Sequence, residues 1–213
     1  MHAIRRPRLV LRGVAIAGLV VGALVLPTRE SSARTAAHSV RWKIHDAMRA
    51  APPAVAGHAT ILDWPKKPGD PSPLLRTGNN GWTCFPDDPT TPRDDPMCLD
   101  KPAMDWLAAW MAGKDPKLTQ PGLGYMLQGG SDASNTDPSA TKPASGQRWL
   151  ITPPHMMIFP IDKLDPDLHG TDPSTGRPWI MWPATAYEHL MIPIRSGRRN
   201  CPWVEGLGGL PTP

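Results

Sequence analysis

The chain twice carries a histidine followed two residues later by a methionine. His155-Met-Met-Ile-Phe-Pro160 is echoed further along by His189-Leu-Met-Ile-Pro193. Side chains two apart on a strand share a face, so each histidine would point the same way as its methionine. If the two runs are neighbours in one sheet, imidazole and thioether groups converge, and that ligand set suits Cu(I). The pattern predicts a soft-metal site, with copper as the cofactor, at His155, Met157, His189 and Met191.

An ordinary structural role also explains the same residues, and methionine usage favours it. Methionine is a common gap filler in protein cores. In this interpretation Met157 and Met191 are core residues, and the two histidines are hydrogen-bonded wall residues. Both interpretations stand at this point.

A polar loop follows the glycine pair Gly129-Gly130. Asp132, Asn135 and Asp137 could offer oxygen ligands to a hard cation such as Ca²⁺, although their spacing does not match an EF-hand. Asp and Asn also cap and turn loops through their own side chains, which is the alternative interpretation. Beside the histidine strand, these three residues would form the lip of a ligand pocket.

Two other function classes remain open. His155 or His189 could act as a general base with an aspartate from the 131–137 loop, as in a small cell-envelope hydrolase. The chain has no Gly-x-Ser-x-Gly or His-Glu-x-x-His motif to support hydrolysis. A glycan-binding module would instead use exposed indoles, for which the candidates are Trp64, Trp82, Trp179, Trp182 and Trp203.

The first 33 residues have the pattern of an export signal. Four arginines between Arg5 and Arg12 precede an apolar run over 13–26, and Ser31-Ser-Ala33 offers a cleavage site. The alternative is an uncleaved membrane anchor over residues 9–26. We therefore expect a signal peptide over 1–33, one globular domain over 34–205, a flexible tail over 206–213, and a periplasmic or secreted protein.

The positive charge of the chain belongs to this leader. Residues 1–33 hold five arginines and one glutamate, and the remainder carries 18 basic and 18 acidic residues. A neutral mature chain has no basic footprint for nucleic acid. Membrane contact is expected only through the N-terminal segment, and a small ligand or metal is the expected partner. The sequence does not indicate an oligomeric state.

Composition indicates a loop-rich protein with short elements. Of the acidic residues after the leader, 16 are Asp and two are Glu, and Asp favours caps and turns. Trp dominates the aromatic residues, with nine Trp against two Phe and two Tyr. In an exported chain Cys84 and Cys98 are expected to form a disulfide, which leaves Cys201 as the odd cysteine.

Hydrophobic periodicity and turn residues predict short elements throughout. Two helices are expected over 36–49 and 99–113, and a hairpin over 73–85 with its turn at Asn80-Gly81. Further strands are expected over 54–64, 122–128, 149–160, 179–182 and 186–194. Helices and strands do not alternate as in βαβ units. The predicted class is α+β, a small antiparallel sheet with two helices packed on one face.

Several segments resemble a group of exported bacterial proteins without an assigned activity. The segments are Ala59-Thr-Ile-Leu-Asp-Trp-Pro65, Gly81-Trp-Thr-Cys-Phe-Pro86, Tyr125-Met-Leu-Gln-Gly-Gly130 and Tyr187-Glu-His-Leu-Met191. The resemblance implies export and a single domain, and it implies no catalytic residues. The sequence thus favours an exported binding or structural module over an enzyme.

Overall fold

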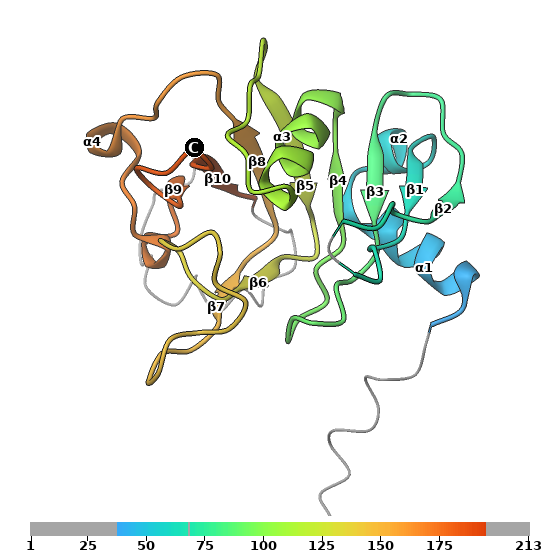
Figure 1. The fold of residues 1–213 in the computed structure, drawn as a ribbon, viewed down its shortest axis with the longest axis horizontal. Coiled ribbons are helices and arrows are strands. Elements are labelled where there is room, and N and C mark those ends of the chain that lie inside the picture. Colours follow the sequence, from blue (N-terminus) through green and yellow to red (C-terminus); the bar gives the residue numbers. More distant parts are fainter. Residues whose placement is uncertain (1–37, 68, 195–213) are drawn as a thin grey trace, which may run out of the picture. The chain divides into compact units, whose positions relative to one another are not determined.

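The fold is built on one large mixed sheet (Figure 1). A computed structural model describes residues 38–67 and 69–194 of the chain. Eight strands run in the order β2-β1-β3-β4-β5-β8-β10-β9, and a separate pair of strands, β6 and β7, forms a second sheet. The strands of the large sheet are β1 (Thr60–Leu62), β2 (Leu74–Arg76), β3 (Thr83–Phe85), β4 (Met97–Leu99), β5 (Gly122–Met126), β8 (His155–Phe159), β9 (Trp179–Met181) and β10 (His189–Pro193).

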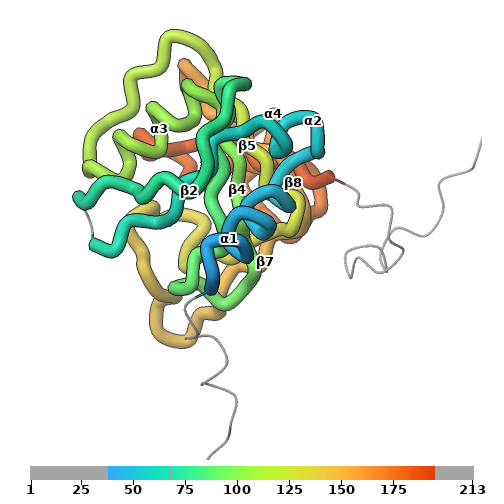
Figure 2. The backbone as a smooth tube through the Cα atoms, turned by 90° about the vertical axis from the view of Figure 1, so that its right-hand side faces the viewer, coloured from blue at the N-terminus to red at the C-terminus, as the bar shows by residue number. Residues whose placement is uncertain are grey.

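The helices are short and lie on both faces of this sheet. They are α1 (Val40–Ala47), the 3-10 turn η2 (Met48–Ala50), α2 (Pro53–Ala56), α3 (Lys101–Met111), α4 (Pro166–His169) and the 3-10 turn η3 (Pro173–Thr175). Cys84 and Cys98 pack with the alanines of α1, η2 and α2, whereas the next residues, Phe85 and Leu99, pack with α3. Successive strand residues face opposite ways. In Figure 2, α3 and α2 accordingly lie on opposite sides of β4.

The predicted fold class is therefore wrong. The sheet is large rather than small, it is mixed because β1 and β3 run parallel, and helices cover both faces. The sequence did not predict the three-residue strands β4 (Met97–Leu99) and β6 (Gly130–Asp132), and the number of strands that join one sheet depends on pairing between distant segments. The loop-rich character agrees with the prediction.

Helix α3 confirms the helix predicted over 99–113. The Asp100 side chain accepts a hydrogen bond from the Ala103 N–H, and Pro102 occupies the first turn. Gly113 follows the helix with a φ of 63°. Trp106 and Leu107 are buried against the sheet, so this helix carries one wall of the main core.

The first part of the chain differs from the prediction in two places. Residues 54–64 form α2 and then the short strand β1 rather than one strand. Pro53 at the first helical position favours this start. Strands β2 and β3 do not form a hairpin, because β1 lies between them and pairs with both.

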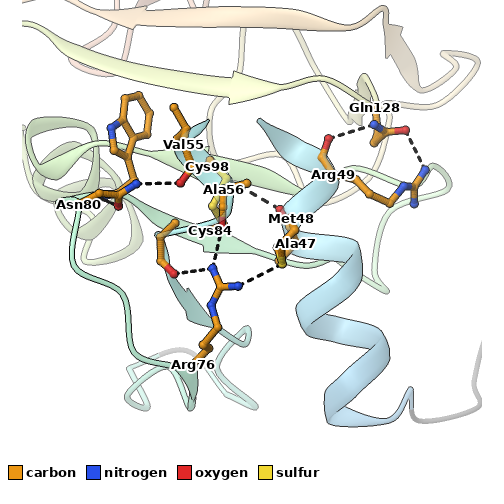
Figure 3. Close-up of a disulfide and its surroundings, with 12 residues drawn as sticks. Ala47, Met48, Arg49, Val55, Ala56, Arg76, Asn80, Cys84, Cys98 and Gln128 are labelled. Atoms are coloured by element: carbon orange, nitrogen blue, oxygen red, sulfur yellow. Dashed lines mark hydrogen bonds between the residues drawn. A yellow bond between two sulfur atoms is a disulfide. The ribbon is translucent and has the colours of Figure 1, made fainter. Parts of the chain in front are cut away.

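Cys84 and Cys98 form the predicted disulfide, directly opposite one another on β3 and β4 (Figure 3). Arg76 reaches under this region and donates to the carbonyl oxygens of Ala56 and Ala59. The disulfide joins β3 to β4, and the partly buried Arg76 ties β2 to α2 and to the residue before β1.

The predicted strand over 149–160 is two strands in two sheets. Leu150–Thr152 forms β7 and pairs with β6 (Gly130–Asp132), whereas β8 begins at His155. Pro153 and Pro154 separate them, since proline lacks the N–H that a ladder needs. Strands β8 and β10 are antiparallel neighbours, so the two His-x-Met runs do share a sheet.

Several predictions concern residues outside the described part. The leader over 1–33, the tail over 206–213, Trp203 and Cys201 lie there. Within residues 38–67 and 69–194, none of the helices has both the length and the apolar character that a membrane crossing requires.

Candidate functional site

A cavity of about 320 Å³ lies on the face of the sheet that α3 covers. The sheet contributes Met157 and Phe159 from β8 and His189 and Met191 from β10. Helix α3 contributes Trp106, Leu107 and Trp110, and the segment over 131–141 lines another side. Pockets of this size accommodate small organic molecules.

Indole side chains form much of the cavity wall. Five tryptophans line it: Trp64, Trp106, Trp110, Trp149 and Trp182. The N–H groups of three of them donate to backbone carbonyl oxygens, Trp64 to Pro86, Trp110 to Pro138 and Trp182 to Ser134. Because the protein already uses these N–H groups, these three rings offer a ligand hydrocarbon and π surface rather than donors.

Trp182 adopts a backbone conformation that non-glycine residues rarely use. Its φ is 53°, in the left-handed region. The turn holds it there, since its N–H donates to Asn135 O and its carbonyl accepts from Thr185 Oγ1. The indole stacks on Trp110 at a centroid distance of 5.5 Å. Such conformations cost about 1–3 kcal/mol and cluster at functional sites, so this one marks the wall around Trp182 as a candidate site.

His189 is buried in an aromatic surround at the base of the cavity. Its ring centroid lies 5.2 Å from those of Trp106, Phe159 and Trp182. The contact between Nδ1 and Tyr187 O, at 3.0 Å, places the proton on Nδ1 of the neutral ring and leaves Nε2 as an acceptor. Burial lowers the pKa of His189 to about 4, so the ring is neutral at pH 7.

Asp132 is a partly buried carboxyl without a hydrogen-bond partner among the described residues. It lies at the end of β6 and lines the cavity. In the described part of the chain, no hydrogen bond or ion pair involves its carboxyl. Burial raises the pKa of Asp132 to about 7, and no neighbouring cation opposes this effect. Ser131 beside it is buried, with its Oγ also unpaired within the described residues.

Asp95 is a second buried carboxyl in the cavity lining, and it is well bonded. It accepts from the Thr91 hydroxyl at 2.6 Å and from the Asp88 N–H. Burial raises the pKa of Asp95 to about 7 despite these bonds. The Asp95 carboxyl therefore holds the 87–95 loop together, whereas the Asp132 carboxyl is available to a ligand.

The structure brings together three of the four predicted soft-metal residues. Met157 and Met191 are directly opposed across β8 and β10, and His189 shares their face and the cavity. Along the backbone, His155 is four residues, or about 13 Å, from the level of His189, although the two rings are near enough for His155 to lower the pKa of His189. Its Nδ1 contacts Pro153 O at 2.7 Å, its Nε2 is buried without a partner, and it does not line the cavity. His155 begins β8 and His189 begins the antiparallel strand β10, so the two rings lie toward opposite ends of the strand pair. The two histidines and two methionines therefore do not converge on one point.

Hard-ligand and catalytic clusters are not formed by the described residues. No group of three His, Cys, Asp or Glu side chains there could hold a metal ion. In the 131–137 loop, Asp137 accepts from Ser139, and Asn135 bonds to Trp179 and Thr171. Asp137 forms a local turn at the exposed lip of the cavity, whereas Asn135 links the loop to distant segments of the chain.

The hydrolase pair and the row of exposed tryptophans are also not assembled. Within residues 38–67 and 69–194, the two β-strand histidines bond to carbonyl oxygens and to no carboxylate. Of the candidate sugar-stacking indoles, Trp64 and Trp182 line the cavity and Trp179 is buried in the core. Trp82 packs on Tyr125 at the opposite face. These indoles do not form one flat surface.

Sequence reasoning missed Asp95 and the α3 tryptophans as cavity residues. Trp106 and Trp110 carry the periodicity of a buried helix face, which does not reveal a cavity beneath them. Asp95 stands in a run of aspartates and prolines that reads as a solvated loop. Among the acidic residues of the cavity, the sequence singled out Asp132 and Asp137, which follow the glycine pair Gly129-Gly130.

Comparisons of this chain with protein-family models, curated proteins and solved structures gave no match.

Proposed function

We propose that this protein is an exported binding protein that holds a small, largely apolar molecule in the cavity between α3 and the 131–141 segment. The observation that carries the proposal is the cavity of about 320 Å³, walled by five indoles and floored by methionines, with one unpaired carboxyl. Apolar pockets with a few polar groups are typical binding sites. The apolar lining supplies affinity, while Asp132 and His189 would set the orientation of the ligand.

Binding rather than catalysis fits the chemistry of the polar groups. A general base needs a partner that orients it and a proton within reach. His189 is oriented by a carbonyl oxygen, and its pKa of about 4 makes it a weak base. We therefore assign His189 the role of a hydrogen-bond acceptor for the ligand.

A fluorescent uncharged probe tests this proposal. N-phenyl-1-naphthylamine should bind at one saturable site with enhanced emission. Ala133 lines the cavity, so Ala133→Phe should abolish the signal, whereas Ala108→Phe on the exposed side of α3 should retain it. Absence of saturable binding, or equal binding to Ala133→Phe, contradicts the proposal.

Cu(I) binding is the second candidate function. It is favoured by the direct opposition of Met157 and Met191, with His189 on the same face and its Nε2 free to ligate. Two thioethers and one imidazole form a set that soft Cu(I) accepts. A ligating imidazole usually donates its other N–H to a carbonyl oxygen, as His189 does to Tyr187.

A further inference from the structure

The charged groups of the cavity are all of one sign. Four aspartates line it, Asp88, Asp95, Asp132 and Asp137, and no lysine or arginine of the described residues does. The one histidine in the lining is neutral at pH 7. A low-dielectric cavity focuses such a field, so it favours a positively charged occupant and disfavours an anion.

The hydrogen-bonding groups show the same bias. Asp132 offers carboxylate oxygens, and His189 offers the lone pair of Nε2, because its Nδ1 faces the Tyr187 carbonyl. Three indole N–H groups, which could have served as donors, are bonded to backbone carbonyls. The Ser131 and Thr141 hydroxyls and the indole N–H groups of Trp106 and Trp149 also line the cavity and can donate. At Asp132 and at Nε2 of His189, a matching ligand must bring donors of its own.

The aromatic and sulfur-containing walls add a third preference. Indole faces attract cations through their quadrupole, more strongly where water is excluded. Five methionines also line the cavity, and their thioethers are polarizable: Met97, Met126, Met157, Met181 and Met191. An apolar body would contact these walls while its charged end reaches Asp132.

We propose that the ligand is an organic ammonium ion with an apolar body, bound with its charged end at Asp132. This inference rests on the proposed binding function and adds the charge class of the ligand. The ammonium group would donate hydrogen bonds to the carboxylate of Asp132, which has no hydrogen-bond partner among the described residues. Its positive charge would favour the ionised form of Asp132. Nε2 of His189 would accept a second hydrogen bond from the same group or from the body of the ligand.

Three probes of nearly equal shape test the charge class at pH 7.5: 2-phenylethylammonium, 2-phenylethanol and phenylacetate. Isothermal titration calorimetry on the mature chain should show the cation binding about tenfold more tightly than the alcohol, with phenylacetate weakest. Equal affinity for the cation and the alcohol, or tighter binding of phenylacetate, overturns the charge class and leaves the proposed function standing. If none of the three binds and N-phenyl-1-naphthylamine also fails, both proposals fall.

A pair of variants locates the preference. Asp132→Asn should bring the affinities for the cation and the alcohol within about twofold of one another, because the carboxylate charge is removed. The matched control is Asp137→Asn at the exposed lip, which should retain the preference because an exposed carboxylate is screened by water. A preference that survives in Asp132→Asn contradicts the assignment.

A pH comparison on the unaltered protein covers the case in which Asp132→Asn does not fold. Asp88, Asp95, Asp137 and His189 share the cavity with Asp132. At pH 5.5 Asp132 and Asp95 are protonated, whereas His189 remains neutral because its pKa is about 4. The cation preference should therefore shrink at pH 5.5, and a preference that does not change with pH contradicts the proposal.

Discussion

Met157 on β8 lies directly opposite Met191 on β10, and both side chains face the cavity under α3. This pairing places one of the two His-x-Met histidines, His189, in the cavity and leaves the other outside it. The pattern that suggested a four-residue metal site instead forms part of the floor of a binding cavity.

Copper binding, if present, should follow this asymmetry. A Cu(I) competition titration should lose tight one-to-one binding in Met157→Ala, Met191→Ala and His189→Ala, because these three residues share the cavity. His155→Ala should leave the affinity within about threefold, because His155 lies about 13 Å away along the strands. Unaltered binding in all of the first three variants rules out the site.

The disulfide should contribute stability without affecting ligand binding. Cys84 and Cys98 are 14 residues apart in sequence and lie in the core on the face away from the cavity. Replacing both by alanine should lower the free energy of unfolding by about 3 kcal/mol, the value that chain-entropy arguments give for such a loop. Urea titrations measure this loss, and probe affinity at low urea should be unchanged. A variant as stable as the parent shows that the link is dispensable.

The turn between β9 and β10 contains a residue that glycine would replace favourably. Ala184 is exposed and has a φ of 62°, a conformation that costs residues with a Cβ. Ala184→Gly should therefore raise the free energy of unfolding by about 0.5–1 kcal/mol. The same change at Ala108, exposed on α3, should lower it by about 1 kcal/mol. Thermal unfolding of the two variants gives the signs, and a destabilised Ala184→Gly refutes the strain.

Stability should depend on pH through two opposed groups of buried residues. Asp95 and Asp132 have pKa values raised to about 7, so their protonation stabilises the folded state below pH 7 and the contribution is lost as pH rises through 7. His155 and His189 have pKa values lowered to about 4. Below pH 6.5 these histidines take up protons in the unfolded chain but stay neutral in the folded chain. Acid therefore destabilises the folded state through the histidines.

The free energy of unfolding should consequently fall by about 1 kcal/mol in total from pH 6 to pH 8, because the histidines offset part of the loss from the two carboxyls, and it should change little between pH 4.5 and 6. Urea titrations at several pH values measure the profile. Asp132→Asn should abolish the fall above pH 6, and His155→Leu should make the protein more stable as pH falls from 6 to 4.5. A profile that rises from pH 6 to pH 8 contradicts the assigned directions.

Local sequence signals correctly predicted the features that depend on a few identifiable residues. Asp100 and Pro102 located the start of α3, and the paired cysteines located the contact between β3 and β4. Long-range pairing was not readable: the strong turn signal at Asn80-Gly81 indicated a hairpin, yet β1 inserts between β2 and β3. Four residues of the cavity were predicted from the sequence: His189, Met157, Met191 and Asp132. The histidine and the methionines followed from the period-two alternation of strand residues, and Asp132 followed from the glycine pair that precedes its loop. The share that was missed, Asp95 and the α3 indoles, depends on which loops the fold brings over the sheet.

The measurement that most directly tests the central claim is the tryptophan indole N–H spectrum of the mature protein, labelled with ¹⁵N at Trp, during titration with 2-phenylethylammonium. The cavity contains Trp64, Trp106, Trp110, Trp149 and Trp182, whereas Trp42 lies on exposed α1 and Trp82 on the opposite face. We predict saturable shifts of the cavity resonances and none for Trp42 and Trp82. Shifts confined to Trp42 or Trp82, or the absence of any saturable shift, would contradict the assignment of the cavity as the binding site.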